Sequence, residues 1–314
     1  MKGGWQKDEG RKKSATAIVP LPSAVEYAMR LLVTADLHYN HPKSKALADD
    51  LIDEMNHAGG DVLLVIGDAG VADGDSLEQC LSRFDFPGVK LFVPGNHELW
   101  SQAGDSYALF HHTLPRRIRD VGWHWLQGEP LRLGDVGFAG SIGWYDYAFA
   151  PPELGIPRRF YEHKISPRAA ERQKAYATLF EPSDDISFEA RKLFARWNDA
   201  KFVRLGRSDE AFLDELLAAL RAQFQSLSDA PRVVAAVHHL PFAQLLPPPH
   251  SARWDFAKAF LGSPRIGEML LEFPNVQKVF CGHSHFAAEA VVGAIHAVNI
   301  GSGYRGKTFK RVEL

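Results

Sequence analysis

The apolar run VLLVI at residues 62–66 limits the possible folds more than any other stretch of this sequence. A strand with one face in water alternates apolar and polar residues, whereas an unbroken apolar run indicates a strand covered on both faces. Similar short runs occur at residues 30–34 and 89–93, and the segments between them, 43–55 and 77–84, have the periodicity of amphipathic helices. This alternation of strands and helices predicts an α/β fold.

The middle of the chain has a different pattern. Further strands are predicted at residues 121–126, 131–133, 136–139, 232–237 and 276–280, followed by a hairpin of residues 286–292 and 294–300 that turns at Gly293. Strand patterns are missing from residues 144–230, where helices are expected at 169–180, 188–197 and 210–227. Because 13 basic residues balance 13 acidic ones over residues 151–230, we interpret this segment as a helical insertion or cap and not as a nucleic-acid-binding arm.

Composition sets limits on the class of protein. A chain of 314 residues with 46% hydrophobic and 24% charged residues is typical of a globular protein with a sizeable core. The net charge of -2 favours neither nucleic acid nor an anionic membrane as a partner, and no apolar stretch approaches the ~20 residues that cross a bilayer. Cys80 and Cys281 are the only cysteines, which indicates a reducing compartment and a cytoplasmic location.

The N-terminal residues 1–28 lack the apolar segment of a signal peptide. We expect them to form an extension that is either disordered or precedes a natural start at Met29. Residues 29–314 are expected to form one domain, with the insertion at about 144–230. No feature of the sequence indicates an oligomeric state.

Polar side chains follow five of the predicted strands directly. They are Asp36 and His38, then Asp68, then Asn96 and His97, then His238 and His239, and finally His283 and His285. Ligands of open α/β sheets bind outside the carboxyl ends of the strands, and carboxylate and imidazole groups are the preferred ligands of zinc, iron and manganese. A carboxylate can also bridge two cations, so about seven side chains are enough for a pair of metal ions.

Each of these short motifs also has a simpler interpretation. An Asp-x-His pair alone is usually a hydrogen-bonded loop, a single histidine at a strand end is usually structural, and GDAG alone is usually a turn. The five motifs occur in order, however, each after an apolar run, and folding requires none of them. The joint pattern therefore favours a metal site.

The motifs together resemble those of the calcineurin-like metallophosphoesterases. The similarity extends from about residue 30 to 298 and rests on Asp36-x-His38, Gly67-Asp68, Gly95-Asn96-His97-Glu98, His238 and Gly282-His283-Ser284-His285. The resemblance implies a four-layer αββα sandwich, in which two packed mixed β-sheets are flanked by helices and carry the helical insertion. It also implies two divalent metal ions, such as Mn, Fe or Zn.

The resemblance assigns a role to each residue of the motifs. Asp36, His38 and His285 would bind the first metal ion, Asn96, His238 and His283 the second, and Asp68 both; Asp68 and His97 would be the catalytic residues. His97 would not bind metal but would lie beside the leaving-group oxygen. The implied reaction is hydrolysis of a phosphoester, a diester or a monoester, by a metal-bridging hydroxide. A metal-dependent nuclease and a non-catalytic scaffold of the same fold are the alternatives.

Some assignments remain open at this level. His238 and His239 both match the fourth motif; we expect His238 to bind metal, because it follows the apolar run directly, and His239 to line the pocket. Glu98 either orients His97 or caps the following helix end. Trp144 and Tyr145 either stack on a substrate or form the base of the cap.

Arg116 lies in an arginine pair that either binds a substrate phosphate or is solvated surface. The identity of the phosphoester substrate does not follow from the sequence.

Overall fold

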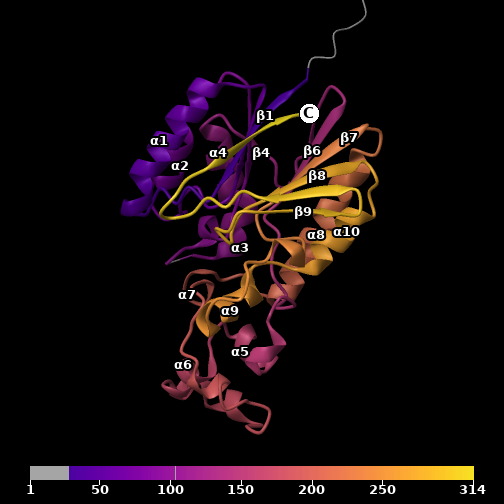
Figure 1. The fold of residues 1–314 in the computed structure, drawn as a ribbon. Coiled ribbons are helices and arrows are strands. Elements are labelled where there is room, and N and C mark those ends of the chain that lie inside the picture. The colour runs from indigo at the N-terminus through magenta and orange to yellow at the C-terminus, as the bar shows by residue number, and fades with distance from the viewer. Residues whose placement is uncertain (1–27, 103) are drawn as a thin grey trace, which may run out of the picture.

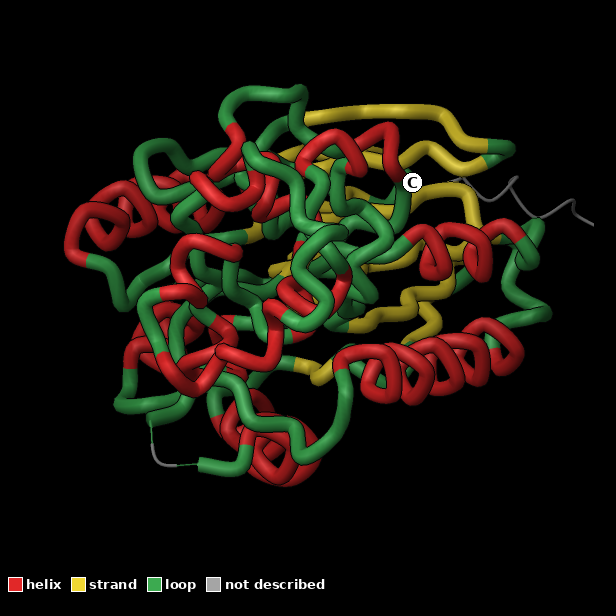
Figure 2. The backbone as a smooth tube through the Cα atoms, turned by 90° about the horizontal axis from the view of Figure 1, so that it is seen from below, coloured by secondary structure: helices red, strands yellow, loops and turns green. Residues whose placement is uncertain are grey.

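Two β-sheets packed face to face form the centre of the molecule. The computed structural model describes residues 28–314 except residue 103, so the predicted N-terminal extension lies outside the described residues apart from residue 28. Figure 1 shows helices α1, α2 and α4 on one side of the sheets and α8 and α10 on the other, and Figure 2 shows the same layers from below. The predicted four-layer α/β sandwich is therefore confirmed.

The first sheet contains the strands predicted from the N-terminal part of the chain. Its order is β11-β1-β2-β3-β4, and its strands are β1 (Arg30–Ala35), β2 (Val62–Ile66), β3 (Val89–Val93), β4 (His124–Trp125) and β11 (Phe309–Glu313). Strands β1 to β4 are parallel, and β11 pairs antiparallel with β1. The prediction missed β11, and it made β4 too long because helix α4 and a turn at Gly122, where φ is 79°, occupy residues up to 122.

The second sheet contains six strands in the order β5-β6-β7-β8-β10-β9. They are β5 (Leu131–Leu133), β6 (Val136–Ser141), β7 (Arg232–Val237), β8 (Val276–Cys281), β9 (Ala288–Val292) and β10 (Ile295–Asn299). The inner four strands are parallel, and β5 and β9 pair antiparallel at the two edges. The hairpin of β9 and β10 turns at Gly293 as predicted.

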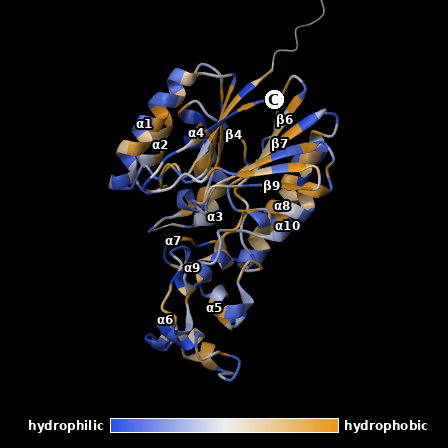
Figure 3. Cartoon of the chain, viewed as in Figure 1, coloured by the Kyte–Doolittle hydropathy of each residue, from blue (hydrophilic) through white to orange (hydrophobic). Residues whose placement is uncertain are grey.

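The alternation of side chains along β2 explains its unbroken apolar sequence. Val62, Leu64 and Ile66 face the second sheet and belong to the core between the sheets, whereas Leu63 and Val65 face the helices. All five side chains are fully buried. Figure 3 shows hydrophobic residues along the strands of both sheets, in agreement with a sandwich whose strands are covered on both faces.

Helices cover both outer faces. The helices of this part of the molecule are α1 (Pro42–Ala58), α2 (Ser76–Ser82), α3 (Ser106–Ala108), α4 (Leu114–Asp120), α8 (Asp209–Ser226) and α10 (Pro264–Leu271). A π-helical turn, Leu109–Thr113, joins α3 to α4. The helix predicted at 210–227 is α8, and it lies on the second sheet, where Gln223 exchanges two hydrogen bonds with the backbone of Gly140. Only the earlier part of the predicted insertion therefore forms the cap.

The cap projects from one end of the sandwich (Figure 1). Its helices are α5 (Arg158–Glu162), α6 (Pro167–Glu171) and α7 (Asp199–Phe202), next to α9 (Ala252–Ala257), and its small core includes Phe160, Ile165 and Leu179. The predicted helix 169–180 is wrong in part, because α6 ends at Glu171 and a 3-10 helix, Lys174–Phe180, follows.

The predicted helix 188–197 is also wrong, since it contains only the 3-10 turn Ala190–Lys192. Its backbone pairs with an earlier segment of the cap: Ser166 N donates to Ala195 O at 3.0 Å, and Trp197 N donates to Lys164 O at 2.9 Å. The Ser166 hydroxyl adds a bond to Leu193 O. These tertiary hydrogen bonds replace the helical ones. No helix in the described residues is long and apolar enough to cross a membrane.

Candidate metal centre

The predicted ligands lie in loops whose backbone has an uncommon conformation. In the described residues, seven non-glycine residues have positive φ, and five of them are predicted ligands: Asp36, His38, Asp68, His283 and His285, with φ between 45° and 67°. Such left-handed conformations are unfavourable for residues with a Cβ and concentrate at functional sites. Each loop turns immediately after its strand, so side chains from both sheets point to the same place.

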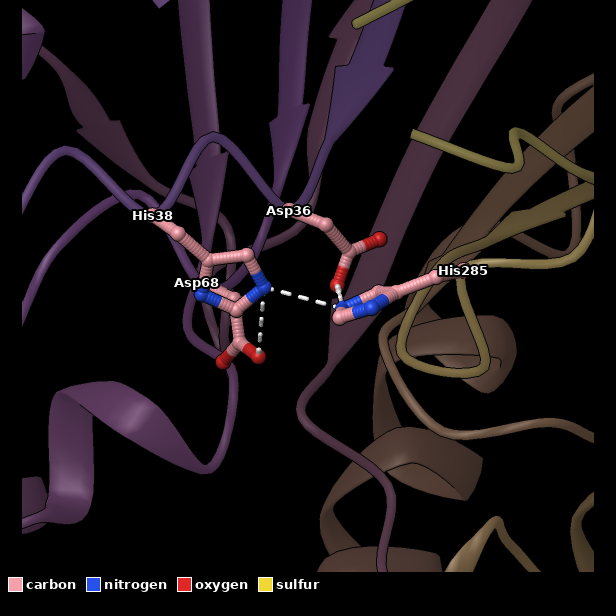
Figure 4. Close-up of side chains that lie close together, drawn as sticks. All are labelled: Asp36, His38, Asp68 and His285. Carbon is pink, nitrogen blue, oxygen red and sulfur yellow. Dashed lines mark hydrogen bonds and ion pairs between the residues drawn. The ribbon is translucent and has the colours of Figure 1, made fainter. Parts of the chain in front are cut away.

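Four side chains form the first group. Asp36, His38, Asp68 and His285 each offer one atom, and these atoms all lie within 4.8 Å of one another. Figure 4 shows the four side chains pointing toward one another. The two Nε2 atoms of His38 and His285 are 2.9 Å apart, and His285 Nε2 is 3.5 Å from Asp36 Oδ1. Two imidazoles and two carboxylates at this spacing fit a divalent transition metal.

The second group consists of Asp68, His238 and His283, which meet the same distance criterion, and Asn96 lies beside it. Within the described residues, Asn96 Oδ1, His238 Nε2 and His283 Nδ1 are buried and have no hydrogen-bond partner. Buried polar atoms without partners are costly. A cation that accepts these three lone pairs would remove that cost, so the donor set fits a second metal ion.

The other polar atom of each of these three side chains is held in place. Asn96 Nδ2 donates to Asp199 at 2.9 Å, His238 Nδ1 to the carbonyl of Ile66 at 3.0 Å, and His283 Nε2 to the carbonyl of Phe260 at 3.1 Å. These contacts fix the imidazole tautomers and direct a free lone pair toward the centre, which is the usual arrangement around metal ligands.

Asp68 lies between the two groups and belongs to both. It is 1% exposed, and Asp68 Oδ1 is 3.4 Å from His238 Nε2. Burial alone would raise the pKa of Asp68, but His97, His238 and His38 around it hold this pKa well below its ordinary value. In return, burial would lower the pKa of His238, and Asp68 raises it to about 9. Asp68 thus favours a proton on His238 Nε2 in the absence of metal, and a cation bound at the second group would take the place of that proton.

Glu98 connects two of the loops. Its buried carboxylate accepts hydrogen bonds from the backbone N–H groups of Asp68 at 2.8 Å, Gly70 at 3.0 Å and Gly95 at 2.7 Å. Burial, together with the charge of Asp68, raises the pKa of Glu98 to about 7. Neither predicted role is observed, because Glu98 ties the Asp68 loop to the Asn96 loop instead of orienting His97 or capping a helix.

His97 lies at the edge of the centre. Its ring stacks on Trp100, with the ring centroids 3.6 Å apart, and its Nε2 is 3.7 Å from Asp68 Oδ2. Its side chain is 10% exposed, so part of the ring reaches the surface. Burial lowers the pKa of His97, and the charges of Asp68 and Asp199 oppose this effect. The free protein therefore favours the neutral imidazole, and a phosphoryl group would favour the protonated form by its negative charge.

The structure separates the two histidines of the fourth motif. His238 belongs to the second group, whereas His239 lies outside both groups, with its ring centroid 4.2 Å from that of His283. His239 Nδ1 contacts Ile142 O at 2.9 Å, and its Nε2 is buried without a partner in the described residues. This geometry supports His238 as the metal ligand.

None of the three other predicted substrate contacts belongs to either group. Trp144 and Tyr145 are both 0% exposed and donate to Asp209 and Asp199, respectively. Neither ring has a free face for a base, which favours the base of the cap as their role. Arg116 is exposed and lines a different cavity of about 450 Å³ near α4.

Sequence reasoning missed one segment of the site. The loop between β10 and β11 brings Tyr304 over His38, with the ring centroids 4.2 Å apart and the rings nearly parallel at 18°. Lys307 from the same loop donates to the backbone oxygen of Asp36 at 2.6 Å. The glycines of GSGYRGK, residues 301–307, were the available signal for a functional loop after a predicted strand.

Comparisons with known proteins identify the family of the chain. The family profile described as calcineurin-like phosphoesterase matches residues 29–287. A crystal structure of phosphopantetheinyl hydrolase from Mycobacterium tuberculosis is similar with a TM-score of 0.63 and 18% identity, over 88% of this chain and 90% of that one. A dimetal phosphatase from Danio rerio reaches 0.45 with 11% identity, over 91% and 93% of the two chains. No curated protein sequence matches significantly.

Proposed function

This chain belongs to the calcineurin-like phosphoesterase family, and we propose that it hydrolyses phosphoesters with two divalent metal ions held by the two groups described above. Asp36, His38 and His285 would hold one ion, Asn96, His238 and His283 the other, and Asp68 would hold both. The three orphaned donor atoms of the second group are the observation that carries the proposal, because they give the site a reason to bind a second cation.

Each part of the chain has a defined task in this reaction. When bound, the two cations supply activation of water at neutral pH and neutralisation of the phosphoryl oxygens. The loops after β1, β2, β3, β7 and β8 fix the ligands before the substrate arrives. His97, held by Trp100, would donate a proton to the leaving-group oxygen. A membrane partner is not part of the proposal.

Turnover of two model substrates tests the function. We would load the protein with Mn²⁺ and compare bis(p-nitrophenyl) phosphate with p-nitrophenyl phosphate. Asn96→Ala should lose turnover. Asn56→Ala is the matched control: Asn56 also donates one hydrogen bond through its amide, in this case to the backbone carbonyl of Arg83, and its buried Oδ1 also has no partner in the described residues, but it lies on α1. Faster cleavage of the diester identifies a phosphodiesterase, and faster cleavage of the monoester identifies a phosphatase.

The same assay separates the alternatives. A phosphopantetheinyl ester belongs in the substrate panel because of the similar fold of the Mycobacterium tuberculosis enzyme. Cleavage of nucleic acid with steeply salt-dependent binding would identify a nuclease. No turnover of any substrate by protein that holds two metal ions would contradict the catalytic proposal and favour a scaffold.

The acid role of His97 has its own test. His97→Ala should slow hydrolysis of alkyl esters much more than that of nitrophenyl esters, because only the poor alkoxide leaving group needs a proton. Equal losses on the two kinds of ester would contradict the role of His97 as an acid.

A further inference from the structure

Asp199 connects the cap to the candidate metal centre. It lies at the start of α7, is 1% exposed, and accepts four side-chain hydrogen bonds. Its Oδ1 accepts from Asn96 Nδ2 at 2.9 Å and Trp100 Nε1 at 2.7 Å; its Oδ2 accepts from Tyr145 OH at 2.9 Å and Trp197 Nε1 at 2.8 Å. A carboxylate has about four acceptor sites, so Asp199 is saturated and is not free to bind a metal ion itself.

The contact with Asn96 selects one of two amide orientations. The oxygen and the NH₂ group of an asparagine side chain have nearly the same shape, and a half-turn exchanges them. A carboxylate accepts hydrogen bonds but cannot donate them, so Asp199 stabilises the orientation in which the NH₂ group faces the cap. The Oδ1 atom then faces the second group, where it is buried and has no partner in the described residues.

The contact with Trp100 extends to the predicted acid. The indole ring of Trp100 lies between His97, at a centroid distance of 3.6 Å, and Phe202, at 4.9 Å. The hydrogen bond from its Nε1 to Asp199 fixes the rotation of the ring in this stack. The same carboxylate thus holds a metal ligand directly and the imidazole of His97 through one intermediate side chain.

We propose that Asp199 is a positioning residue through which the cap completes the second half of the metal centre. The inference rests on the proposed function and deepens it: the helical insertion supplies the acceptor that turns the oxygen of Asn96 toward the second ion. A cap that only covered the site would not need a carboxylate at this position.

Asp209 provides a matched control. It is also a buried carboxylate, 6% exposed, and accepts hydrogen bonds from Trp144 Nε1 at 2.8 Å, Tyr147 OH and Lys164 Nζ. It therefore anchors the same region with the same kinds of donors, but it contacts none of the predicted ligands. Asp209→Asn should disturb the packing of the cap at least as much as Asp199→Asn does.

Titration of the metal-free full-length protein with Mn²⁺ by calorimetry tests the proposal, with thermal unfolding in EDTA as the readout of packing. The wild type should bind two ions. Asp199→Asn should weaken one site by about 10–100-fold, as found for other residues that orient metal ligands, and leave the other site nearly unchanged. Asp209→Asn should lower the unfolding temperature in EDTA but keep both affinities within roughly threefold of wild type.

A second variant keeps the proposal testable if Asp199→Asn does not fold. Asn96→Asp keeps the shape of the side chain and introduces a stronger ligand, which by itself should tighten the site. Facing Asp199, it would place two carboxylates 2.9 Å apart, so we expect weaker binding instead. The double variant Asn96→Asp with Asp199→Asn restores a donor and an acceptor and should regain affinity.

The outcomes separate this inference from the proposed function. A wild-type protein that binds no Mn²⁺ would overturn both. Two results would overturn only the role of Asp199, provided that the wild type has two sites. They are an Asp199→Asn variant with unchanged Mn²⁺ affinity and an Asn96→Asp variant that binds Mn²⁺ more tightly. Equal weakening by Asp199→Asn and Asp209→Asn would also overturn it, because the effect would then come from the packing of the cap in general.

Discussion

Replacing Gly95 by alanine tests the metal centre at its most crowded point. The added Cβ would lie 2.2 Å from Asp68 Oδ1 and 2.7 Å from both Asp68 N and His238 Nε2. Real Cβ atoms essentially never approach other atoms within 3.0 Å, so the carboxylate must move away by about 0.8 Å or more. The backbone of Gly95 lies outside the positive-φ region, so alanine can adopt it and the effect is purely steric.

This displacement is large on the scale of metal coordination. Metal–ligand distances vary by about 0.2 Å, and a carboxylate displaced several times as far cannot bridge two ions. We expect Gly95→Ala to weaken Mn²⁺ binding by at least about tenfold, the lower limit for losing an orienting contact. The cost to the metal-free protein should be the ~1–3 kcal/mol that is typical of an overpacked site, which a folded chain of this size tolerates.

Calorimetric titration with Mn²⁺ and urea unfolding in EDTA measure the two effects separately. Gly306→Ala is the control, because a Cβ at Gly306 would meet no atom within 4 Å and its φ is not positive. It should leave both Mn²⁺ affinities unchanged. If Gly95→Ala bound two ions as tightly as the wild type, Asp68 could not be the shared ligand, and the geometric argument for the centre would be refuted.

Three further predictions concern stability and chemistry. Gln223→Leu should lower the free energy of unfolding, measured in urea, by about 2–5 kcal/mol, because it leaves the buried N–H and C=O of Gly140 without partners. Gln225→Leu, on the exposed face of α8, should change this free energy by no more than ~0.5 kcal/mol. Equal effects of the two substitutions would contradict the role of the Gln223 amide. Burial raises the pKa of both Cys80 and Cys281, so Ellman's reagent should modify neither thiol in the native protein and both in urea; rapid reaction before unfolding would contradict this. When the free concentration of metal ion is a hundred times its Kd, each bound ion stabilises the fold by about 2.7 kcal/mol. EDTA should therefore lower the unfolding temperature of the metal-loaded protein by roughly 5–10 °C. An unchanged unfolding temperature would argue against bound metal.

The convergence of the polar side chains could be predicted from the sequence because their position follows from strand geometry. The carboxyl ends of parallel strands meet at one edge of a sheet, so Asp36, Asp68 and Asn96 had to converge once β1, β2 and β3 were recognised. The spacing of Asp36 and His38, with one residue between them, was enough to predict that their side chains lie together. The left-handed backbone of these residues could not be predicted, since neither aspartate nor histidine requires positive φ.

The cap was predicted less well because tertiary contacts decide its structure. Residues 188–197 have a helical sequence pattern, but hydrogen bonds with Lys164 and Ser166 pair residues 193–197 with the earlier segment instead. Pairing between segments about 30 residues apart leaves no periodic signal. For the same reason, Asp199 could not be linked to Asn96, which is 103 positions away in sequence.

The arrangement of acceptors shows how the protein prepares the site before any ion binds. Glu98 holds the loop of Asn96 against the loop of Asp68 from within the sandwich, and Asp199 holds Asn96 from the cap. Both act through hydrogen bonds to carboxyl oxygens, which are about twice as strong as neutral ones when the carboxyl group is ionised. In the described part of the chain, the loops are thus fixed with three atoms of the second group unpaired and with left-handed backbone at five predicted ligands. Such an arrangement is unfavourable without metal, and the binding of the ions offsets it, so metal affinity and stability of the fold should change together in every variant that moves these loops.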